Sequence, residues 1–194
     1  MVYRRALPAG LLFSTVCSVL TAADLPRKAP DFTIALTNGQ KVSLSSYKGK
    51  VVALCFILTG CPHCQQTIGY LVKDQAEYGP RGFQVLASAI NQDAQAALPG
   101  FINSFHTTFP VGFSDALMSL EFMQHPPARV PHMPLLAFID RKGMVRAQHE
   151  GEEEAFFGDR QEQNLRAQIE ALLDETPAPP KGPARKSAAT KKGS

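Results

Sequence analysis

Two cysteines, Cys61 and Cys64, lie two residues apart in the stretch TGCPHCQQ, with Pro62 and His63 between them. Three kinds of chemistry use a cysteine pair at this spacing: thiol–disulfide exchange, metal binding and covalent haem attachment. Haem attachment requires a histidine directly after the second cysteine, where this chain has Gln65. The pair is therefore a redox centre or part of a metal site.

A structural zinc site needs four ligands, which usually come from two such pairs. The chain has four cysteines, and the remaining two are Cys17 and Cys55. Cys17 lies in an apolar N-terminal segment, and Cys55 lies within a run typical of a buried strand, where an inert thiol is expected. Because no second pair completes a zinc site, redox exchange is the favoured chemistry.

The elements that flank the pair suit this chemistry. The apolar run Lys50–Leu58 predicts a strand buried on both faces, and a helical pattern opens at Pro62, where a missing N–H costs nothing, and continues to about Tyr78. A cysteine in the first turn of a helix faces the positive end of the helix dipole, which stabilises its thiolate. We therefore expect Cys61 to attack and Cys64, one turn deeper, to resolve the mixed disulfide.

The rest of the chain alternates strand and helix patterns. Asn38-Gly39 within FTIALTNGQKVSL predicts a β-hairpin. The further predicted elements are a buried strand in FQVLASAIN, helices around 94–105 and 117–124, strands in LLAFID and MVRAQHEG, and a final amphipathic helix at 161–173. The helix after the cysteines is expected to bury Ile68, Leu71, Val72 and Ala76, and the last helix Leu165, Ile169, Leu172 and Leu173. This order predicts one three-layer α/β domain over residues 24–175.

The two ends of the chain differ from this domain. Residues 1–23 place Arg4 and Arg5 before an apolar stretch and small residues, which is the pattern of a cleaved signal peptide, with an uncleaved anchor as the alternative. The apolar stretch is shorter than the roughly 20 residues of a spanning helix, so the mature chain is expected to have no membrane span. Residues 176–194 are rich in Pro, Ala, Lys and Gly, which predicts a disordered basic tail.

The charge of the chain divides along the same boundaries. Residues 24–175 contain 13 basic and 17 acidic residues, a net charge of −4, although the whole chain has a formal charge of +3. The basic residues that create the overall positive charge lie in the two ends, so nucleic-acid binding is not indicated. We expect an exported monomer in the periplasm or at the extracytoplasmic face of a bacterial envelope.

The stretch APDFTIALTNGQKVSLSSYKGKVVALCFILTGCPHC resembles the opening of TlpA/ResA-like thiol-disulfide oxidoreductases, in the Redoxin neighbourhood of the thioredoxin-like superfamily. The later segments FPVGFSD and VPHMPLLAFIDRKGMVRAQHEG also resemble that branch, so the likeness runs from about Ala29 to Gly151. It implies a thioredoxin-like three-layer α/β/α sandwich with a central mixed sheet and an N-terminal β-hairpin extension. It also implies exchange with protein thiols and disulfides, in cytochrome c maturation or envelope disulfide handling, with no cofactor beyond the Cys61–Cys64 disulfide.

The resemblance assigns a substrate-binding role to two further residues. Pro134, six residues before Asp140, corresponds to the family's cis-proline, which lies against the disulfide. Met133 would then offer its backbone to an incoming substrate chain. The competing proline, Pro131, has the wrong spacing to Asp140.

The chain also departs from the family pattern. Gly60 replaces the usual Trp, Cys55 stands where thioredoxins have a buried acid, and Thr67 stands where TlpA-like reductases often have Glu. The usual proton acceptors for the second cysteine are therefore missing. The inner dipeptide Pro-His resembles that of DsbA-type oxidases, in which His63 would stabilise the Cys61 thiolate and make the disulfide more oxidising.

Two alternatives come from other classes of protein. Cys61, Cys64 and His132 could bind copper, because thiolates and imidazole suit that metal and His132 resembles the histidine of Sco-type copper-delivery proteins. Those proteins, however, have three residues between their cysteines. A peroxidase of the peroxiredoxin branch would need Thr at position 58, where this chain has Leu58. The other histidines, His106, His125 and His149, are expected at the surface.

Overall fold

The computed structural model describes residues 24–175, so the predicted signal peptide and basic tail lie outside the described residues. These residues form one eight-stranded mixed sheet, with strand order β1-β8-β7-β4-β5-β6-β2-β3. The strands are β1 Arg27–Lys28, β2 Thr33–Ala35, β3 Lys41–Ser43, β4 Val51–Ile57, β5 Phe83–Ala89, β6 Val111–Phe113, β7 Leu135–Ile139 and β8 Met144–Glu150. β4 pairs in parallel with β5 and antiparallel with β7.

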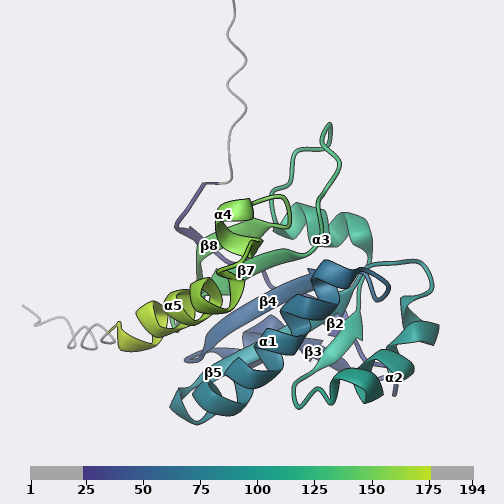
Figure 1. The fold of residues 1–194 in the computed structure, drawn as a ribbon, viewed down its shortest axis with the longest axis horizontal. Coiled ribbons are helices and arrows are strands. Elements are labelled where there is room, and N and C mark those ends of the chain that lie inside the picture. Colours follow the sequence, from purple (N-terminus) through teal and green to yellow (C-terminus); the bar gives the residue numbers. More distant parts are fainter. Residues whose placement is uncertain (1–23, 176–194) are drawn as a thin grey trace, which may run out of the picture.

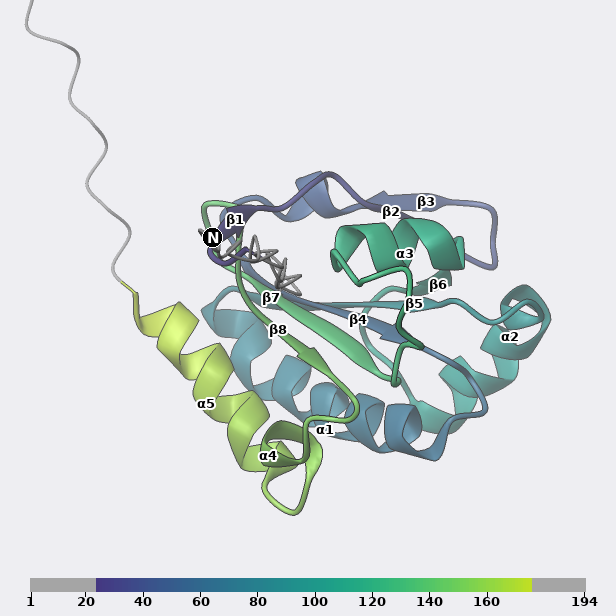
Figure 2. The ribbon, with the colours of Figure 1, turned by 90° about the horizontal axis from the view of Figure 1, so that it is seen from above.

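Helices cover both faces of this sheet (Figures 1 and 2). They are α1 Pro62–Tyr78, α2 Ala94–Phe105, α3 Ala116–Phe122, α4 Glu154–Phe157 and α5 Gln161–Asp174, with short 3-10 helices η1 Leu44–Tyr47 and η2 Gly79–Arg81. One core layer joins α1, α2, α4 and α5 to the sheet, and a second joins α3 and the N-terminal segments to the opposite face. The predicted three-layer α/β/α sandwich with a mixed sheet is confirmed.

The burial of the central strands follows from these two layers. Every residue of β4 is buried, as the unbroken apolar run predicted, because helices on both sides exclude water from it. The predicted hairpin is present as β2 and β3, and it joins the central sheet through a pairing of Ala35 with Phe113 of β6. None of the described helices combines the length and apolar character needed to cross a membrane.

The predicted burial of the two main helices is correct for α5 and partly wrong for α1. All four residues named for α5 are buried. On α1, Ile68 and Leu71 are buried, Val72 is half-buried and Ala76 is exposed, while Asp74 occupies a buried position. The helix is rotated so that a stripe beginning at Cys64 faces the core, and that stripe includes polar side chains which an apolar pattern does not reveal.

Candidate functional site

Cys61 is the N-cap of α1, at the point where the chain leaves β4. Its backbone is extended, with φ −84° and ψ 120°, and its Sγ accepts the N–H of Cys64 at 3.4 Å. Pro62 follows in the first helical turn, where its fixed φ suits the helix and no backbone donor is lost. The thiol of Cys61 therefore lies at the positive end of the helix dipole, with a backbone donor directed at the sulfur.

The second cysteine lies in a different environment. Cys64 has no exposed surface, whereas Cys61 is partly exposed. Burial raises the pKa of the Cys64 thiol and disfavours its thiolate. Burial likewise raises the pKa of Cys55, which the structure places inside β4, as expected for an inert thiol. The pair thus consists of one accessible sulfur and one protected sulfur.

The turn before the cysteines is fixed by residues that the sequence analysis did not identify. Asn91, which follows β5, accepts the N–H of Thr59 at 3.1 Å and donates to its hydroxyl at 2.9 Å. Gln65 donates to the Thr59 carbonyl at 2.9 Å, and the N–H of Cys61 donates to Leu58 at 3.1 Å. Asn91 lies 32 residues after Thr59 in the chain, just past the end of the neighbouring strand β5. Only the parallel pairing of β4 and β5 brings it to Thr59 and reveals its role.

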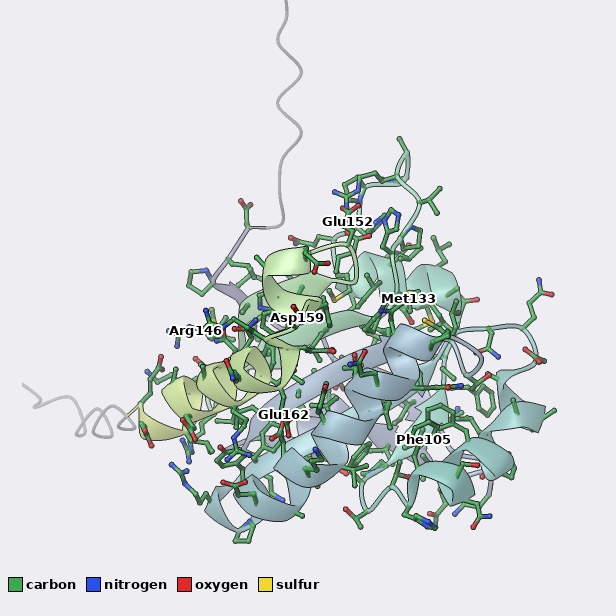
Figure 3. All side chains as sticks on the ribbon, in the orientation of Figure 1. Phe105, Met133, Arg146, Glu152, Asp159 and Glu162 are labelled. Atoms are coloured by element: carbon green, nitrogen blue, oxygen red, sulfur yellow. The ribbon has the colours of Figure 1, made fainter. Side chains whose placement is uncertain are left out.

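Met133 and Pro134 lie directly against the cysteine pair. β7 runs antiparallel to β4, so the start of β7 meets the end of β4 that leads to Cys61. The Met133 carbonyl oxygen is 4.0 Å from the Cys61 sulfur, the Met133–Pro134 bond is cis as the resemblance implied, and Figure 3 shows Met133 beside the first turn of α1. Gly151 packs so tightly here that a Cβ would collide with the Met133 backbone, a constraint that no local sequence pattern indicates.

His63 is exposed in the first turn of α1, and its backbone carbonyl accepts the hydroxyl of Thr67 at 2.9 Å. That hydroxyl also accepts a hydrogen bond of 2.6 Å from the Nε2 of Gln161 at the start of α5. Thr67 and Gln161 are both buried. One turn beyond Cys64, at the position where TlpA-like reductases often have Glu, the helix therefore carries a hydrogen-bonded pair without charge.

The three residues of the copper alternative are not brought together. Within residues 24–175 there is one group of three or more His, Cys, Asp or Glu residues whose ligand atoms all lie within 4.8 Å of one another. This group is formed by His132, Glu150 and Glu152. The Nδ1 of His132 lies 3.1 Å from a Glu152 oxygen, and the backbone N–H of His132 donates to Glu150 at 2.8 Å. His132 therefore pairs with carboxylates and does not join the sulfurs of Cys61 and Cys64 in a common ligand set.

Glu150 anchors the loop that carries Met133. Besides His132, it contacts the Nε2 of His125 at 3.2 Å and Arg129 at 2.5 Å. A single carboxylate at the end of β8 thus holds three points of the segment that leads into Met133. This network ties the segment that leads to the backbone opposite Cys61 to the end of β8.

Two of the histidines expected at the surface are packed instead. The side chain of His125 is 5% exposed because it lies under the Glu150 network. His149 stacks on the ring of Phe156, with ring centroids 3.6 Å apart, and its Nδ1 lies 2.8 Å from Glu153. In both cases a carboxylate accompanies the ring: Glu150, 25 residues along the chain, for His125, and Glu153, four residues along the chain, for His149.

This arrangement can perform one kind of chemistry with its own atoms. An accessible sulfur at a helix N-terminus can attack a disulfide, and a buried sulfur one turn away can displace the resulting mixed disulfide. The adjacent Met133 backbone offers an edge on which an extended substrate chain could pair.

Comparison with known proteins points to the same chemistry. The family model described as Redoxin matches residues 26–169. The thioredoxin-like protein YneN of Bacillus subtilis strain 168 is 27% identical over 126 residues, which cover 64% of this chain and 71% of that protein. The thiol-disulfide oxidoreductase ResA of the same strain is 31% identical over 83 residues, 43% of this chain and 46% of ResA. A candidate thiol:disulfide interchange protein DsbE from Chlorobium tepidum matches with a TM-score of 0.65 and 30% identity, covering 77% of this chain and 98% of that one.

Proposed function

Because the chain belongs to the Redoxin family and is a thioredoxin-like thiol-disulfide oxidoreductase, we propose that it exchanges disulfides with protein substrates through Cys61 and Cys64. The observation that carries this proposal is the asymmetry of the two sulfurs. Cys61 is partly exposed at the helix N-terminus, whereas Cys64 is buried one turn deeper. Such a difference suits an attacking and a resolving thiol.

The exchange proceeds in two balanced steps. The Cys61 thiolate attacks one sulfur of a substrate disulfide, forms a mixed disulfide and releases the other substrate sulfur as a thiolate. Cys64 then loses its proton and attacks the Cys61 sulfur, which releases the second substrate thiolate and leaves the Cys61–Cys64 disulfide. Two electrons pass from the protein to the substrate, and the reverse sequence oxidises a substrate dithiol.

The Met133 backbone would position the substrate during this reaction. Its carbonyl oxygen, 4.0 Å from the Cys61 sulfur, lies where an extended peptide could pair with it and bring a substrate disulfide in line with Cys61. The Glu150 network supports this role because it ties the segment that leads into Met133 to the end of β8. Pro134 is buried next to the Met133 backbone. We propose that Pro134 places no side chain between this backbone and Cys61, so that the edge stays open to a substrate chain.

We propose the place of action from the leader pattern of residues 1–23. A signal peptide, cleaved or retained as an anchor, would deliver the domain to the extracytoplasmic side of a bacterial envelope. Substrates would then be exported proteins that carry disulfides or thiols, including those matured for cytochrome c assembly.

Mixed-disulfide trapping tests the assignment of the two sulfurs. The Cys64→Ala variant should accumulate mixed disulfides with substrate proteins, because nothing resolves the bond to Cys61. The Cys61→Ala variant should accumulate none, and Cys55→Ala should behave as the parent because that thiol is buried in β4. Equal trapping by the Cys61 and Cys64 variants, detected by non-reducing electrophoresis and mass spectrometry, would refute the proposal.

A further inference from the structure

The lysines of the domain are distributed unevenly. Residues 24–175 contain six lysines, and within that part of the chain one of them, Lys73, forms an ion pair, with Glu162. Of the other five, four line a single cavity of about 680 Å³, and Lys41 lies outside it. The four are Lys28 on β1, Lys48 after η1, Lys50 before β4, and Lys142 in the β7–β8 turn. A cluster of like charges is unusual in a domain whose net charge is −4, and it raises the local positive potential.

The two carboxylates in the cavity wall are engaged elsewhere. Asp31 accepts hydrogen bonds from the hydroxyl of Ser43 at 2.7 Å and from the N–H of Ser45 at 3.0 Å. Asp140 accepts the N–H of Lys142 at 2.9 Å and pairs with Arg146 at 3.1 Å. Within residues 24–175, neither carboxylate forms an ion pair with a lysine ammonium, and none of the four ammonium groups is in an ion pair there.

The floor of the cavity is apolar. Leu44, Val52 and Ile139 line it and are buried. The ring of Tyr47 also lines it, and the Lys50 ammonium lies 5.8 Å from the centre of that ring. The cavity therefore combines a cationic rim with an apolar base, and its volume lies in the range of small-molecule sites.

This cavity is remote from the cysteine pair. β4 starts beside the cavity, immediately after Lys50, and its other end leads to Cys61. β7 starts beside Cys61, immediately after Pro134, and ends at the cavity. A strand of this length spans roughly 20 Å. In Figure 3, Arg146 and Met133 mark these two opposite ends of the β7–β8 pair. A ligand here would leave the redox sulfurs accessible.

We propose that this lysine-rimmed cavity binds an organic anion that carries phosphate groups on an apolar body. Four ammonium groups that form no ion pair with the described part of the chain favour a multiply charged anion. Inorganic phosphate alone would leave most of the volume and the whole apolar base unused. Two sources supply this chemistry: a soluble phosphate ester and the headgroup region of an anionic phospholipid.

The test compares two variants of the full chain with equal loss of charge. Lys48→Gln/Lys142→Gln removes two cavity lysines, and Lys41→Gln/Lys73→Gln removes two lysines outside it. Flavin mononucleotide, followed by its fluorescence, serves as the soluble probe, and phosphatidylglycerol vesicles, followed by co-sedimentation, serve as the lipid probe. Basic residues elsewhere in the chain are unchanged in both variants, so their contribution cancels in the comparison.

The cavity variant is expected to bind one probe at least tenfold more weakly than the parent, while the control variant binds within twofold of it. A loss confined to flavin mononucleotide identifies a soluble phosphate ester as the ligand class, and a loss confined to vesicles identifies a lipid. Both variants should retain the parent's disulfide-exchange rate, which shows that they are folded. No binding of either probe at millimolar concentration, or equal loss in both variants, would overturn the proposal.

Discussion

Helix α1 buries two polar side chains against α5, and they differ in charge and in how they are hydrogen-bonded. Thr67, one turn beyond Cys64, accepts a hydrogen bond from Gln161 at 2.6 Å and donates one to the His63 carbonyl at 2.9 Å. Asp74, two turns further along, lies 3.6 Å from Arg166. Its Oδ2 is buried and has no hydrogen-bond partner within residues 24–175.

Of the two buried side chains, Asp74 is the one that titrates, and it lies away from the cysteine pair. Burial raises the pKa of Asp74 to about 7, although the nearby Arg166 guanidinium opposes the shift. Asp74 is roughly 10 Å along the helix from Thr67, which is too far for a direct proton transfer to Cys64. The buried polar side chain nearest to Cys64 in the helix is neutral and hydrogen-bonded, whereas the buried acid affects the stability of the fold. The helix thus has a redox end whose buried polar pair is uncharged and a far end whose buried acid is sensitive to pH.

The largest expected effect comes from giving the redox end an acid. Thr67→Glu would place a carboxylate one turn from Cys64, where it could accept the proton that the buried thiol must lose before it attacks. General base catalysis of this kind accelerates a step by about 100-fold or more. The measurement is a stopped-flow assay of the rate at which Cys64 displaces a chromogenic thiol from Cys61 in a single turnover.

Thr67→Gln is the matched control for Thr67→Glu. Glutamine has the same shape as glutamate and can form hydrogen bonds, but it cannot accept a proton. Thr67→Gln should leave the rate of displacement within about threefold of the parent, on the scale of one neutral hydrogen bond. Equal rates for the Glu and Gln variants would mean that proton acceptance near Cys64 does not limit the reaction, and the contrast between the two ends would lose its functional meaning.

The second prediction concerns the far end of the helix and pH. With a native pKa near 7 and an unfolded value near 4, Asp74 takes up a proton on folding between those pH values, so the free energy of unfolding falls as pH rises through this window. Asp74→Asn removes the buried charge. It should raise the free energy of unfolding by about 2 kcal/mol at pH 8 and leave it nearly unchanged at pH 4.5. Urea denaturation at the two pH values measures the difference.

Glu77→Gln provides the control, since Glu77 is exposed on the same helix and pairs with the same Arg166 at 2.6 Å. It should not stabilise the protein at either pH, because no buried charge is removed. Asp74→Asn should also leave the rate of disulfide exchange unchanged. A stabilisation that is equal at pH 4.5 and pH 8 would show that Asp74 is not ionising in this range.

Particular residues show how far the sequence could predict this site. The strand before Cys61 and the helix after it were predictable because an apolar run and a Cys-Pro helix start are local signals. The family resemblance points to Pro134, and Thr67 is a departure from the family pattern. Gln161 was missed because it lies 94 residues from Thr67, and nothing local marks a polar residue as the partner of another. Asp74 was missed because a hydrophobic pattern assigns acids to the exposed face.

The third prediction tests whether Thr67 and Gln161 act as a unit. Thr67→Val leaves the Gln161 amide without its partner, and Gln161→Leu removes the donor to the Thr67 hydroxyl. Each single change should lower the free energy of unfolding by about 1–2 kcal/mol, and the double change should cost at least 1 kcal/mol less than the sum. A double-mutant cycle in urea measures this coupling. Strict additivity would mean that the 2.6 Å contact contributes nothing specific.

The smallest expected effect concerns His63, the residue between the cysteines. Because the Thr67–Gln161 pair is uncharged, the His63 side chain and the helix N-terminus are the features of α1 that can stabilise the Cys61 thiolate. A stabilised thiolate favours the reduced form, so His63→Pro should make the reduction potential more negative. A change of about 30 mV corresponds to roughly 1.4 kcal/mol for this two-electron couple, a plausible size for one charge-assisted hydrogen bond.

His63→Gln is the control, because it keeps the backbone donor that Pro removes. An equal shift in both variants would assign the effect to the imidazole, and a shift with Pro alone would assign it to the backbone. Equilibration with glutathione measures both potentials. Values equal to that of the parent in both variants would leave His63 without a role in tuning the pair, and the redox end of α1 would then depend on the helix terminus alone.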